Sequence, residues 1–455
     1  MRGGRSLLVL LVLAAGLGAY IYFVEAKREP SGTEKKDKVF TVDASTIDDV
    51  EVHAAAGDVT HLKKTGDTWA ITSPVSAPAD ESTVTSLVDA VAALDVDSVV
   101  DESPTSLSQF GLEPPRYSIA FKAAGDQMSH RLNVGNKTPT SSGLYARVDG
   151  QNRLFLISAY QDDTLDRTTF DLRDKRVLVF TRDAVDAVTL TGKSQPAIAL
   201  AKKGSDWRLT APVDTRADFS PVDGLVGRLD QVRMLSIVAE GSEPTPAQLK
   251  TYGLDAPQVV ATVGAGSAKA TLAIGAKQDD GHLYARDLSR PIVFTVEPAL
   301  LTDLTKKVDD LRVKDVFEFK SYSASSLDVT HGATSVSFGK KKPADAKPDA
   351  PAADVWAQTK PSAKDVNQTA FTDFANTLSS LRIDRFVDNA PASGDDLIVS
   401  SRTGDGATAT EEHVTLRKSG DTVYAIRAGE PGAGVVPTAD FDKALSQLKT
   451  LTEGT

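Results

Sequence analysis

Six histidines are the side chains most able to bind a metal ion or to move a proton near neutral pH. No two of them are spaced as a local ligand pair, such as residues i and i+4. His53 and His61 could meet across a hairpin, but we interpret the histidines as isolated surface residues. The sequence therefore predicts no metal site from this set, which comprises His53, His61, His130, His282, His331 and His413.

Adjacent aspartates are the second group that could do chemistry. Acid–base catalysis needs two carboxylates that face each other across a cleft, and neighbouring positions in the chain do not provide this. We expect most of the pairs in turns or helix caps, and we expect Asp80 and Asp218 to cap the helices that follow them. The pairs are Asp48-Asp49, Asp162-Asp163, Asp279-Asp280, Asp309-Asp310 and Asp395-Asp396.

Two glycine-containing motifs resemble nucleotide-binding sequences only in part. Gly192-Lys193-Ser194 matches the end of a phosphate-binding loop, but Ala187 stands where that loop needs glycine. Gly264-Ala265-Gly266 lacks the third glycine of a dinucleotide-binding turn. The chain also has no cysteine and no Gly-x-Ser-x-Gly elbow. We predict no catalytic, cofactor-binding or metal-binding residue and no cofactor, and therefore a protein that is not an enzyme. A hydrolase whose carboxylates come from different modules is a less favoured alternative.

One polar motif recurs. Tyr145-Ala146-Arg147 matches Tyr284-Ala285-Arg286. An arginine beside an aromatic ring could bind a glycan or a carboxylate. Because the motif belongs to a repeated unit, we interpret it as part of the scaffold and keep glycan binding as an alternative.

These residues sit in an internal repeat, which sets the architecture. Gly66-Asp67-Thr68-Trp69-Ala70-Ile71-Thr72-Ser73-Pro74 matches Gly204-Ser205-Asp206-Trp207-Arg208-Leu209-Thr210-Ala211-Pro212, 138 positions later. The third copy, around Trp356, follows after another 149 positions. These are the only three tryptophans, and the pattern around each predicts a hairpin with tryptophan on its returning strand.

An amphipathic helix is predicted after each hairpin. Apolar residues recur at i, i+3, i+4 and i+7 in all three copies, at the same two offsets as the tryptophans. Such a helix can share one core with the sheet that carries the tryptophan. The apolar positions are Val84, Leu87, Val88 and Val91 in the first copy, Val222, Leu225, Val226 and Leu229 in the second, and Phe371, Phe374, Ala375 and Leu378 in the third.

Further strands complete each copy. Phe110-Gly111-Leu112 and Tyr252-Gly253-Leu254 predict a short helical turn that ends at glycine, and the third copy lacks this turn. Alternating segments then predict strands and a short helix. We therefore expect an α+β fold with a transmembrane helix and three strand-rich repeats of mostly antiparallel sheet, the third degenerate. The expected boundaries are 1–24 for the anchor, 25–37 for a flexible linker, 38–180, 181–319 and 320–455 for the repeats, and 340–353 for an exposed Pro/Ala/Lys-rich loop.

The N-terminal segment predicts a membrane anchor. Residues 6–24 carry no charge and would span about 28 Å as a helix, close to the thickness of the bilayer core. Bulky residues Tyr20, Tyr22 and Phe23 stand where a processing site would need small ones, so an uncleaved signal anchor is favoured over a cleaved signal peptide. We expect a single-pass protein of the bacterial inner membrane with its bulk in the periplasm. Basic residues on both sides of the segment also leave the reverse orientation open.

Net charge of −11 argues against a nucleic-acid partner, because phosphate backbones need a concentrated basic face. The anchor, the tryptophan hairpins, the two Gly-Leu turns and the Leu-Tyr-Ala-Arg strands together resemble a bacterial family known as domain of unknown function 4340. The resemblance covers about residues 40–320 well and the last third weakly. It implies an extracytoplasmic accessory or scaffold protein of an envelope complex, associated with ABC transporters of the gliding-motility type. It supplies no catalytic residue.

Overall fold

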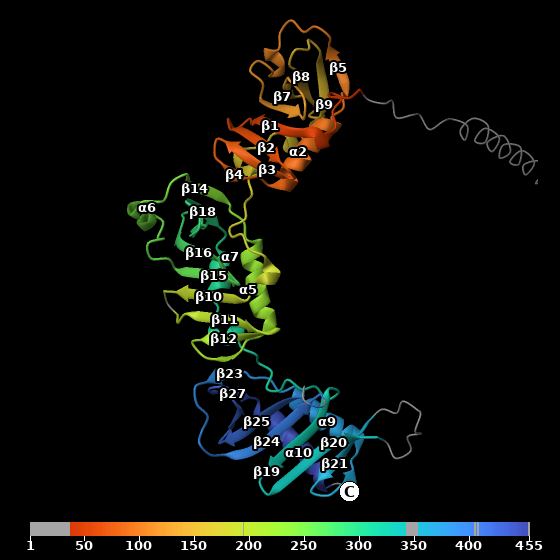
Figure 1. Ribbon diagram of the computed structural model, residues 1–455, viewed down its shortest axis with the longest axis vertical. Helices are drawn as coiled ribbons and strands as arrows, with labels where there is room; N and C mark the ends of the chain where they lie inside the picture. The colour runs from red at the N-terminus through yellow and green to blue at the C-terminus, as the bar shows by residue number, and fades with distance from the viewer. Residues whose placement is uncertain (1–36, 194, 343–353, 405, 407–408, 454–455) are drawn as a thin grey trace, which may run out of the picture. The chain divides into compact units, whose positions relative to one another are not determined.

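The computed structural model describes residues 37–193, 195–342, 354–404, 406 and 409–453. It contains three sheets of nine strands, one in each predicted repeat. Neighbouring strands pair antiparallel throughout. The predicted fold of three antiparallel α+β repeats is therefore confirmed (Figure 1).

The chain divides into two compact units. Repeat 1 lies in the unit that ends at Lys175, and repeats 2 and 3 lie in the unit that begins at Arg176. The expected anchor, residues 1–24, lies outside the described residues, as does the linker up to residue 36. Within the described part of the chain, no helix has the length and apolar character needed to cross a bilayer.

Repeat 1 shows the plan that the other two follow. Its sheet has the order β4-β3-β2-β1-β6-β7-β8-β9-β5, so the strand after the long helix joins the far edge, which the sequence did not predict. The strands are β1 (Ile47–His53), β2 (Val59–Thr65), β3 (Thr68–Ser73), β4 (Ala77–Pro78), β5 (Ser98–Asp101), β6 (Tyr117–Ala123), β7 (His130–Lys137), β8 (Gly143–Val148) and β9 (Leu154–Ser158). The helices are η2 (Ala44–Thr46), α2 (Glu81–Ala93), η3 (Ser108–Phe110), η4 (Ala159–Gln161), α3 (Asp162–Leu165) and α4 (Thr169–Leu172).

Repeat 2 has the same strand order, β13-β12-β11-β10-β15-β16-β17-β18-β14. Its strands are β10 (Ala187–Gly192), β11 (Ile198–Lys203), β12 (Asp206–Ala211), β13 (Thr215–Arg216), β14 (Ser236–Glu240), β15 (Val259–Ala265), β16 (Ala268–Lys277), β17 (Leu283–Asp287) and β18 (Ile292–Val296). Its helices are η5 (Arg182–Ala184), α5 (Phe219–Gln231), α6 (Pro246–Thr251), α7 (Ala299–Leu304) and α8 (Val308–Leu311).

Repeat 3 keeps this order as β22-β21-β20-β19-β24-β25-β26-β27-β23. Its strands are β19 (Ala324–His331), β20 (Thr334–Lys341), β21 (Val355–Lys360), β22 (Lys364–Asp365), β23 (Arg385–Val387), β24 (Asp395–Thr403), β25 (Thr410–Ser419), β26 (Thr422–Arg427) and β27 (Ala433–Val436), and its helices are α9 (Gln368–Ser379) and α10 (Thr438–Glu453). The described part of this repeat has no counterpart of η3 or α6 between β23 and β24, as the sequence predicted. Lys340 and Lys341 end strand β20 rather than beginning the expected loop, whose residues 343–353 lie outside the described ones.

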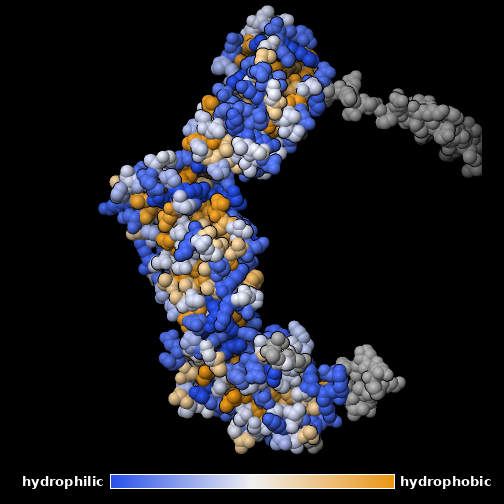
Figure 2. Space-filling model, viewed as in Figure 1, coloured by the Kyte–Doolittle hydropathy of each residue, from blue (hydrophilic) through white to orange (hydrophobic). Residues whose placement is uncertain are grey.

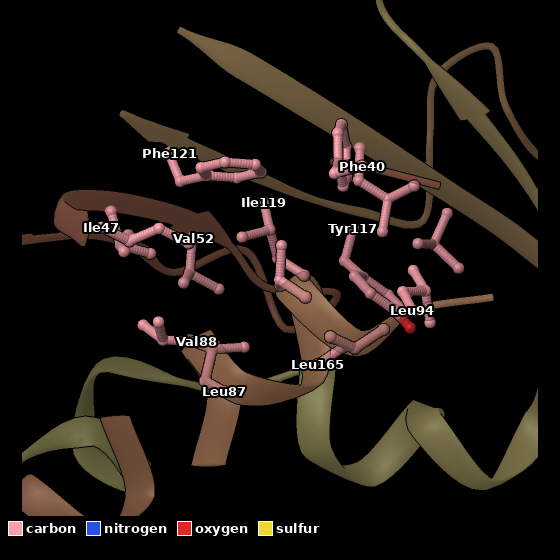
Figure 3. Close-up of a cluster of buried hydrophobic side chains, with 14 of the residues drawn as sticks. Phe40, Ile47, Val52, Leu87, Val88, Leu94, Tyr117, Ile119, Phe121 and Leu165 are labelled. Atoms are coloured by element: carbon pink, nitrogen blue, oxygen red, sulfur yellow. The ribbon is translucent and has the colours of Figure 1, made fainter. Parts of the chain in front are cut away.

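Each long helix covers its own sheet, and the predicted core is confirmed. In repeat 1 the helix residues Leu87 and Val88 face Val52 and Ile119 of the sheet (Figure 3). The three tryptophans are only 5%, 4% and 8% exposed, in chain order. All twelve predicted helix positions are buried as well. One apolar layer between helix and sheet therefore supports each repeat.

The predicted Gly-Leu turns are also present. Gly111 and Gly253 have φ of 67° and 64°, a left-handed conformation that favours glycine. Each turn sets an aromatic ring against the tyrosine of the Tyr-Ala-Arg strand. The ring centroids of Phe110 and Tyr145 are 4.8 Å apart, and those of Tyr252 and Tyr284 are also 4.8 Å apart.

In repeats 1 and 2 a closing segment covers the short edge strand, and its contacts come from residues 172–173 in repeat 1 and 311–312 in repeat 2. Arg173 forms a bridge with Ala79 just after β4, and Arg312 does the same with Ala217 just after β13. The backbone N–H of the helix cap then donates to the closing segment, from Asp80 to Leu172 and from Asp218 to Leu311. The covered edge has fewer free backbone groups with which to pair another chain.

The surface is mixed in character. Figure 2 shows hydrophilic and hydrophobic residues interspersed over the visible face. Large hydrophobic side chains that remain exposed are few among the described residues, and Phe219 at the start of α5 is one of them.

Candidate functional site

The histidines do not gather. Five of them contact a carboxylate of their own repeat, and His413 contacts the hydroxyl of Ser400. His53 and His61 lie on the paired strands β1 and β2, but their rings contact Glu51 and Asp49, respectively. Within the described residues, no group of three or more His, Asp or Glu side chains is placed to hold a metal ion.

The aspartate pairs are separated in space and serve local structure. Asp80 accepts from the N–H of Thr83, and Asp218 accepts from the N–H of Ser220, so both predicted caps are confirmed. Asp162-Asp163 and Asp309-Asp310 lie in the first turns of short helices, and Asp279-Asp280 lies in a turn. The other two pairs, Asp48-Asp49 and Asp395-Asp396, lie in strands rather than in turns or caps.

The Tyr-Ala-Arg motif is used inside each repeat. The Arg286 side chain is 12% exposed and forms an ion pair with Glu243. Arg147 donates from Nε to the carbonyl of Gln151 at 2.7 Å. Together with the tyrosine contacts at the Gly-Leu turns, these bonds favour the scaffold interpretation. Gly192 ends β10 and Gly264 lies in β15, while Ser194 lies outside the described residues.

The structure instead points to a cavity at the junction of repeats 2 and 3. Its volume is ≈ 570 Å³, within the range of small-ligand sites. One wall comes from β12, β13 and the start of α5, and the other from Glu318 and the turn after β26. The charged side chains that line it are Lys203, Asp206, Arg208, Arg216, Glu318, Arg427 and Glu430, and the aromatic ones are Trp207 and Phe219.

Arg216 holds the two repeats together at this cavity. Its Nε donates to Oε1 of Glu430 at 2.6 Å, and its Nη1 donates to Glu318 at 2.8 Å. Thr215 donates to the second oxygen of Glu430 at 2.7 Å. The side chains of Arg216 and Glu430 are each 15% exposed. An ion pair this well buried is costly to break, because either partner alone would be a poorly solvated charge.

Glu412 forms the inner end of the same network. Its carboxylate accepts from the backbone N–H groups of Glu318 and Phe319 at 3.0 Å each. Arg427 donates to it at 2.7 Å and also lies 3.6 Å from Glu430. The segment that joins repeat 2 to repeat 3 is thus bound to β25 through one buried carboxylate.

Both carboxyls are held in the charged form. Burial alone would raise the pKa of Glu430, but Arg216, the hydroxyl of Thr215 and Arg427 together lower that pKa. Burial would likewise raise the pKa of Glu412, and the two backbone N–H groups with Arg427 and Ser401 lower it overall. A lowered pKa suits ion pairing across the junction and is the opposite of what a general acid needs.

Arg312 supports the junction from beside the cavity. Its guanidinium carbon lies 3.5 Å from the ring centroid of Phe386 in repeat 3. The same residue bridges Ala217 in repeat 2. It therefore contacts both repeats, with charge–aromatic attraction on one side.

Arg208, Arg216 and Phe219 of the repeat 2 wall depart from the repeat pattern. At offsets of 138 and 149, Arg208 corresponds to Ala70 and Ala357, and Arg216 corresponds to Pro78 and Asp365. Phe219 corresponds to Glu81 and Gln368. The Glu81 carboxylate accepts from the backbone N–H of Trp69 at 2.7 Å, and Gln368 accepts from Trp356 at 2.9 Å. Phe219 has no acceptor and is 61% exposed.

These departures change what the corner can do. In repeats 1 and 3 a polar side chain closes the gap between hairpin and helix. In repeat 2 an exposed ring, two arginines and Lys203 line an open cavity instead. Such a set of aromatic and cationic groups can bind an anionic, partly apolar ligand, and no proton donor is needed.

Sequence reasoning did not find this cavity. Glu318, Glu412 and Glu430 are far apart in the chain and belong to no motif. Aligning the three repeats position by position would have identified Phe219 and Arg216, since both differ in chemical type from the residues at the same positions of the other two copies.

The chain matches one family model, Domain of unknown function (DUF4340), over residues 69–206 and 207–397. This coverage exceeds half of the chain, so the chain belongs to that family. No curated protein and no solved structure match it.

Proposed function

We propose that this member of the DUF4340 family is a binding scaffold: a non-enzymatic protein whose repeats present contact surface to a partner. The observation that carries this proposal is the junction cavity, where one repeat departs from the common pattern and exposes a ring and cationic groups. Tandem repeats of one fold offer extended binding surface. The three glutamates at the junction are ion-paired, which favours a structural role for them over catalysis.

We further propose that residues 6–24 anchor the protein in the bacterial inner membrane and that the repeats lie in the periplasm. The uncharged length of this segment supports the anchor. Alkaline phosphatase fused after residue 455 tests the orientation. High phosphatase activity is expected if the repeats are periplasmic. Fluorescence from green fluorescent protein fused at the same position would instead place the repeats in the cytoplasm and contradict the proposed orientation.

The proposed partner is an envelope complex, and the resemblance noted from the sequence favours an ABC transporter of the gliding-motility type. The test is chemical crosslinking of intact membranes, followed by purification of the full chain and identification of attached proteins. We expect a multi-subunit membrane transporter among them.

A matched variant makes this test specific for the cavity. Lys203→Glu with Arg208→Glu reverses two charges on one wall and leaves the Arg216–Glu430 ion pair in place. Recovery of the transporter should fall about tenfold, as expected when a favourable charge pair becomes repulsive. Equal recovery from both proteins would remove the cavity from the proposal, and recovery of no envelope protein would overturn the proposed function itself.

A further inference from the structure

The first residue of α5 leaves one backbone donor of repeat 2 without the side-chain partner that its counterparts have. The N–H groups of Trp69 and Trp356 donate to Glu81 and Gln368. Among the described residues, no side chain accepts from the N–H of Trp207. Trp207 and Phe219 both line the cavity, so the place that the Glu81 carboxylate takes in repeat 1 falls at the cavity wall in repeat 2. An oxygen supplied from outside could occupy that place.

We propose that the junction cavity binds an acidic peptide segment of a partner protein. A glutamate or aspartate carboxylate of that segment accepts from the N–H of Trp207, and a neighbouring apolar side chain packs on Phe219. The proposal rests on the proposed function, since it names the class of partner segment that the scaffold would hold.

Charge favours an anion at this place. Lys203 forms no ion pair within the described part of the chain, and Arg208 is paired only with Asp214, whose side chain is 71% exposed. Asp206 is the single acidic residue on the wall formed by β12, β13 and α5, and the other two acidic residues of the cavity, Glu318 and Glu430, are both ion-paired with Arg216. Hydrogen bonds to a charged acceptor are stronger than neutral ones, so a carboxylate gains more here than a neutral amide would.

Shape favours a peptide over a glycan. In the other two repeats the same corner is filled by a glutamate or a glutamine side chain, and a peptide can present a side chain of the same length. The exposed face of Phe219 lies beside this corner and offers apolar contact. A side chain of leucine or phenylalanine next to the acidic residue would gain from this contact in proportion to the area it buries.

The donor can be tested directly in the full chain. Phe219→Glu places in repeat 2 the acceptor that repeat 1 has, and Phe219→Leu is the matched control without an acceptor. Hydrogen–deuterium exchange, followed by mass spectrometry of segment 204–210, should show the Trp207 amide slowed about fivefold in F219E. No slowing should occur in F219L. Equal exchange in both variants would mean that this amide is not available to a ligand, and would overturn the proposal.

The ligand class is tested by selection. Phage-displayed random peptides of twelve residues are selected on the full chain and then measured by fluorescence anisotropy. We expect selected peptides to carry Asp or Glu beside an apolar residue and to bind F219E at least tenfold more weakly than the unaltered chain. Replacing the peptide's acidic residue with alanine should have a similar effect, and replacement of Glu with Gln should cost less. Selected peptides without a carboxylate, or equal binding to F219E, would overturn the proposal.

A second arm separates a glycan ligand from a peptide. Uronic-acid oligosaccharides are assayed against the same proteins. Binding of these sugars that is lost in F219E, without binding of acidic peptides, would replace the peptide with a glycan and overturn the proposal. The two proposals fail in different ways. If the transporter is recovered from membranes but acidic peptides do not bind, only this inference is overturned. If acidic peptides bind but no envelope protein is recovered, the proposed function is overturned.

Discussion

The corner between hairpin and helix is built differently in repeats 1 and 2, although the two sheets have the same strand order. In repeat 1 the corner is closed by its own residues, with Glu81 bound to the Trp69 N–H and Pro78 at the edge strand. In repeat 2 the same positions carry Phe219 and Arg216, and Arg216 bonds to repeat 3. One corner completes a fold, and the other joins two folds and leaves a cavity.

This difference shows where to look for function in a tandem array. Positions that agree between copies are explained by the shared core, as with the tryptophans. Positions that differ are free of that requirement and can serve contacts that only one copy makes. The junction of repeats 2 and 3 should therefore depend on the residues that repeat 2 does not share with repeat 1.

The largest expected effect is at the inner end of the junction network. Glu412→Ala leaves Arg427 and two backbone N–H groups without their acceptor, which should destabilise the second unit by about 3–5 kcal/mol. Equilibrium urea unfolding of the full chain measures this loss. Glu411→Ala, at the adjacent exposed position, is the control and should change stability by less than about 0.5 kcal/mol. Equal effects of the two changes would show that the buried carboxylate does not hold the joining segment.

Breaking the bond between repeats should cost somewhat less. Arg216→Ala is expected to lower the free energy of unfolding by about 2–3 kcal/mol, because the Glu430 carboxylate loses a charged donor. A double-mutant cycle with Glu430→Ala should give a coupling energy of roughly 1 kcal/mol or more. The change at the matched position of repeat 1, Pro78→Ala, should show no coupling to Glu430. A coupling of zero in the first cycle would remove the distinction between the two corners.

The corner of repeat 1 should respond to loss of its acceptor. Glu81→Ala is expected to cost about 1 kcal/mol, since the Trp69 N–H loses one hydrogen bond. Phe219→Ala in repeat 2 removes an exposed ring that accepts no such bond, so it should cost less than half as much by the same urea measurement. If Phe219→Ala were the more destabilising change, the ring would belong to the core of repeat 2 rather than to a binding surface.

The smallest expected effect is that of pH on the stability of the second unit, which should change little near neutral pH and fall only in acid. The lowered pKa values of Glu412 and Glu430 mean that their stabilising contribution is fully present above about pH 4.5, the ordinary value for glutamate, and is lost as pH falls through the lower folded values. Stability of the second unit should therefore be flat with respect to these groups from pH 7 to about pH 5 and fall below that. Exchange of segment 314–319 with deuterium, measured from pH 7 to pH 3 with correction for the intrinsic rate, should rise only at the acid end. An increase in the corrected exchange rate as pH falls from 7 to 6 would contradict the assigned ion pairs.

Much of the fold could be predicted because it depends on local patterns. The spacing of Val84, Leu87 and Val88 defines one helix face, and glycine at 111 marks a turn that needs positive φ. The junction could not be predicted in this way. Glu412 meets Phe319 only because β25 lies within a sheet whose order is set by long connections, and no spacing in the sequence encodes that meeting. The far edge position of β5 was missed for the same reason.

The closing segments decide where this chain can be cut. Arg312 is bonded to the edge of repeat 2, and Asp315, three residues later, bridges Arg382 of repeat 3. A fragment that stopped before residue 311 would keep every strand of repeat 2, but the edge strand of its sheet would be exposed. Copies of that fragment could then aggregate by pairing through the exposed edge. A fragment meant to fold by itself should therefore extend past the sequence repeat into the next one, because the repeating unit of the sequence is shorter than the unit that covers its own sheet edge.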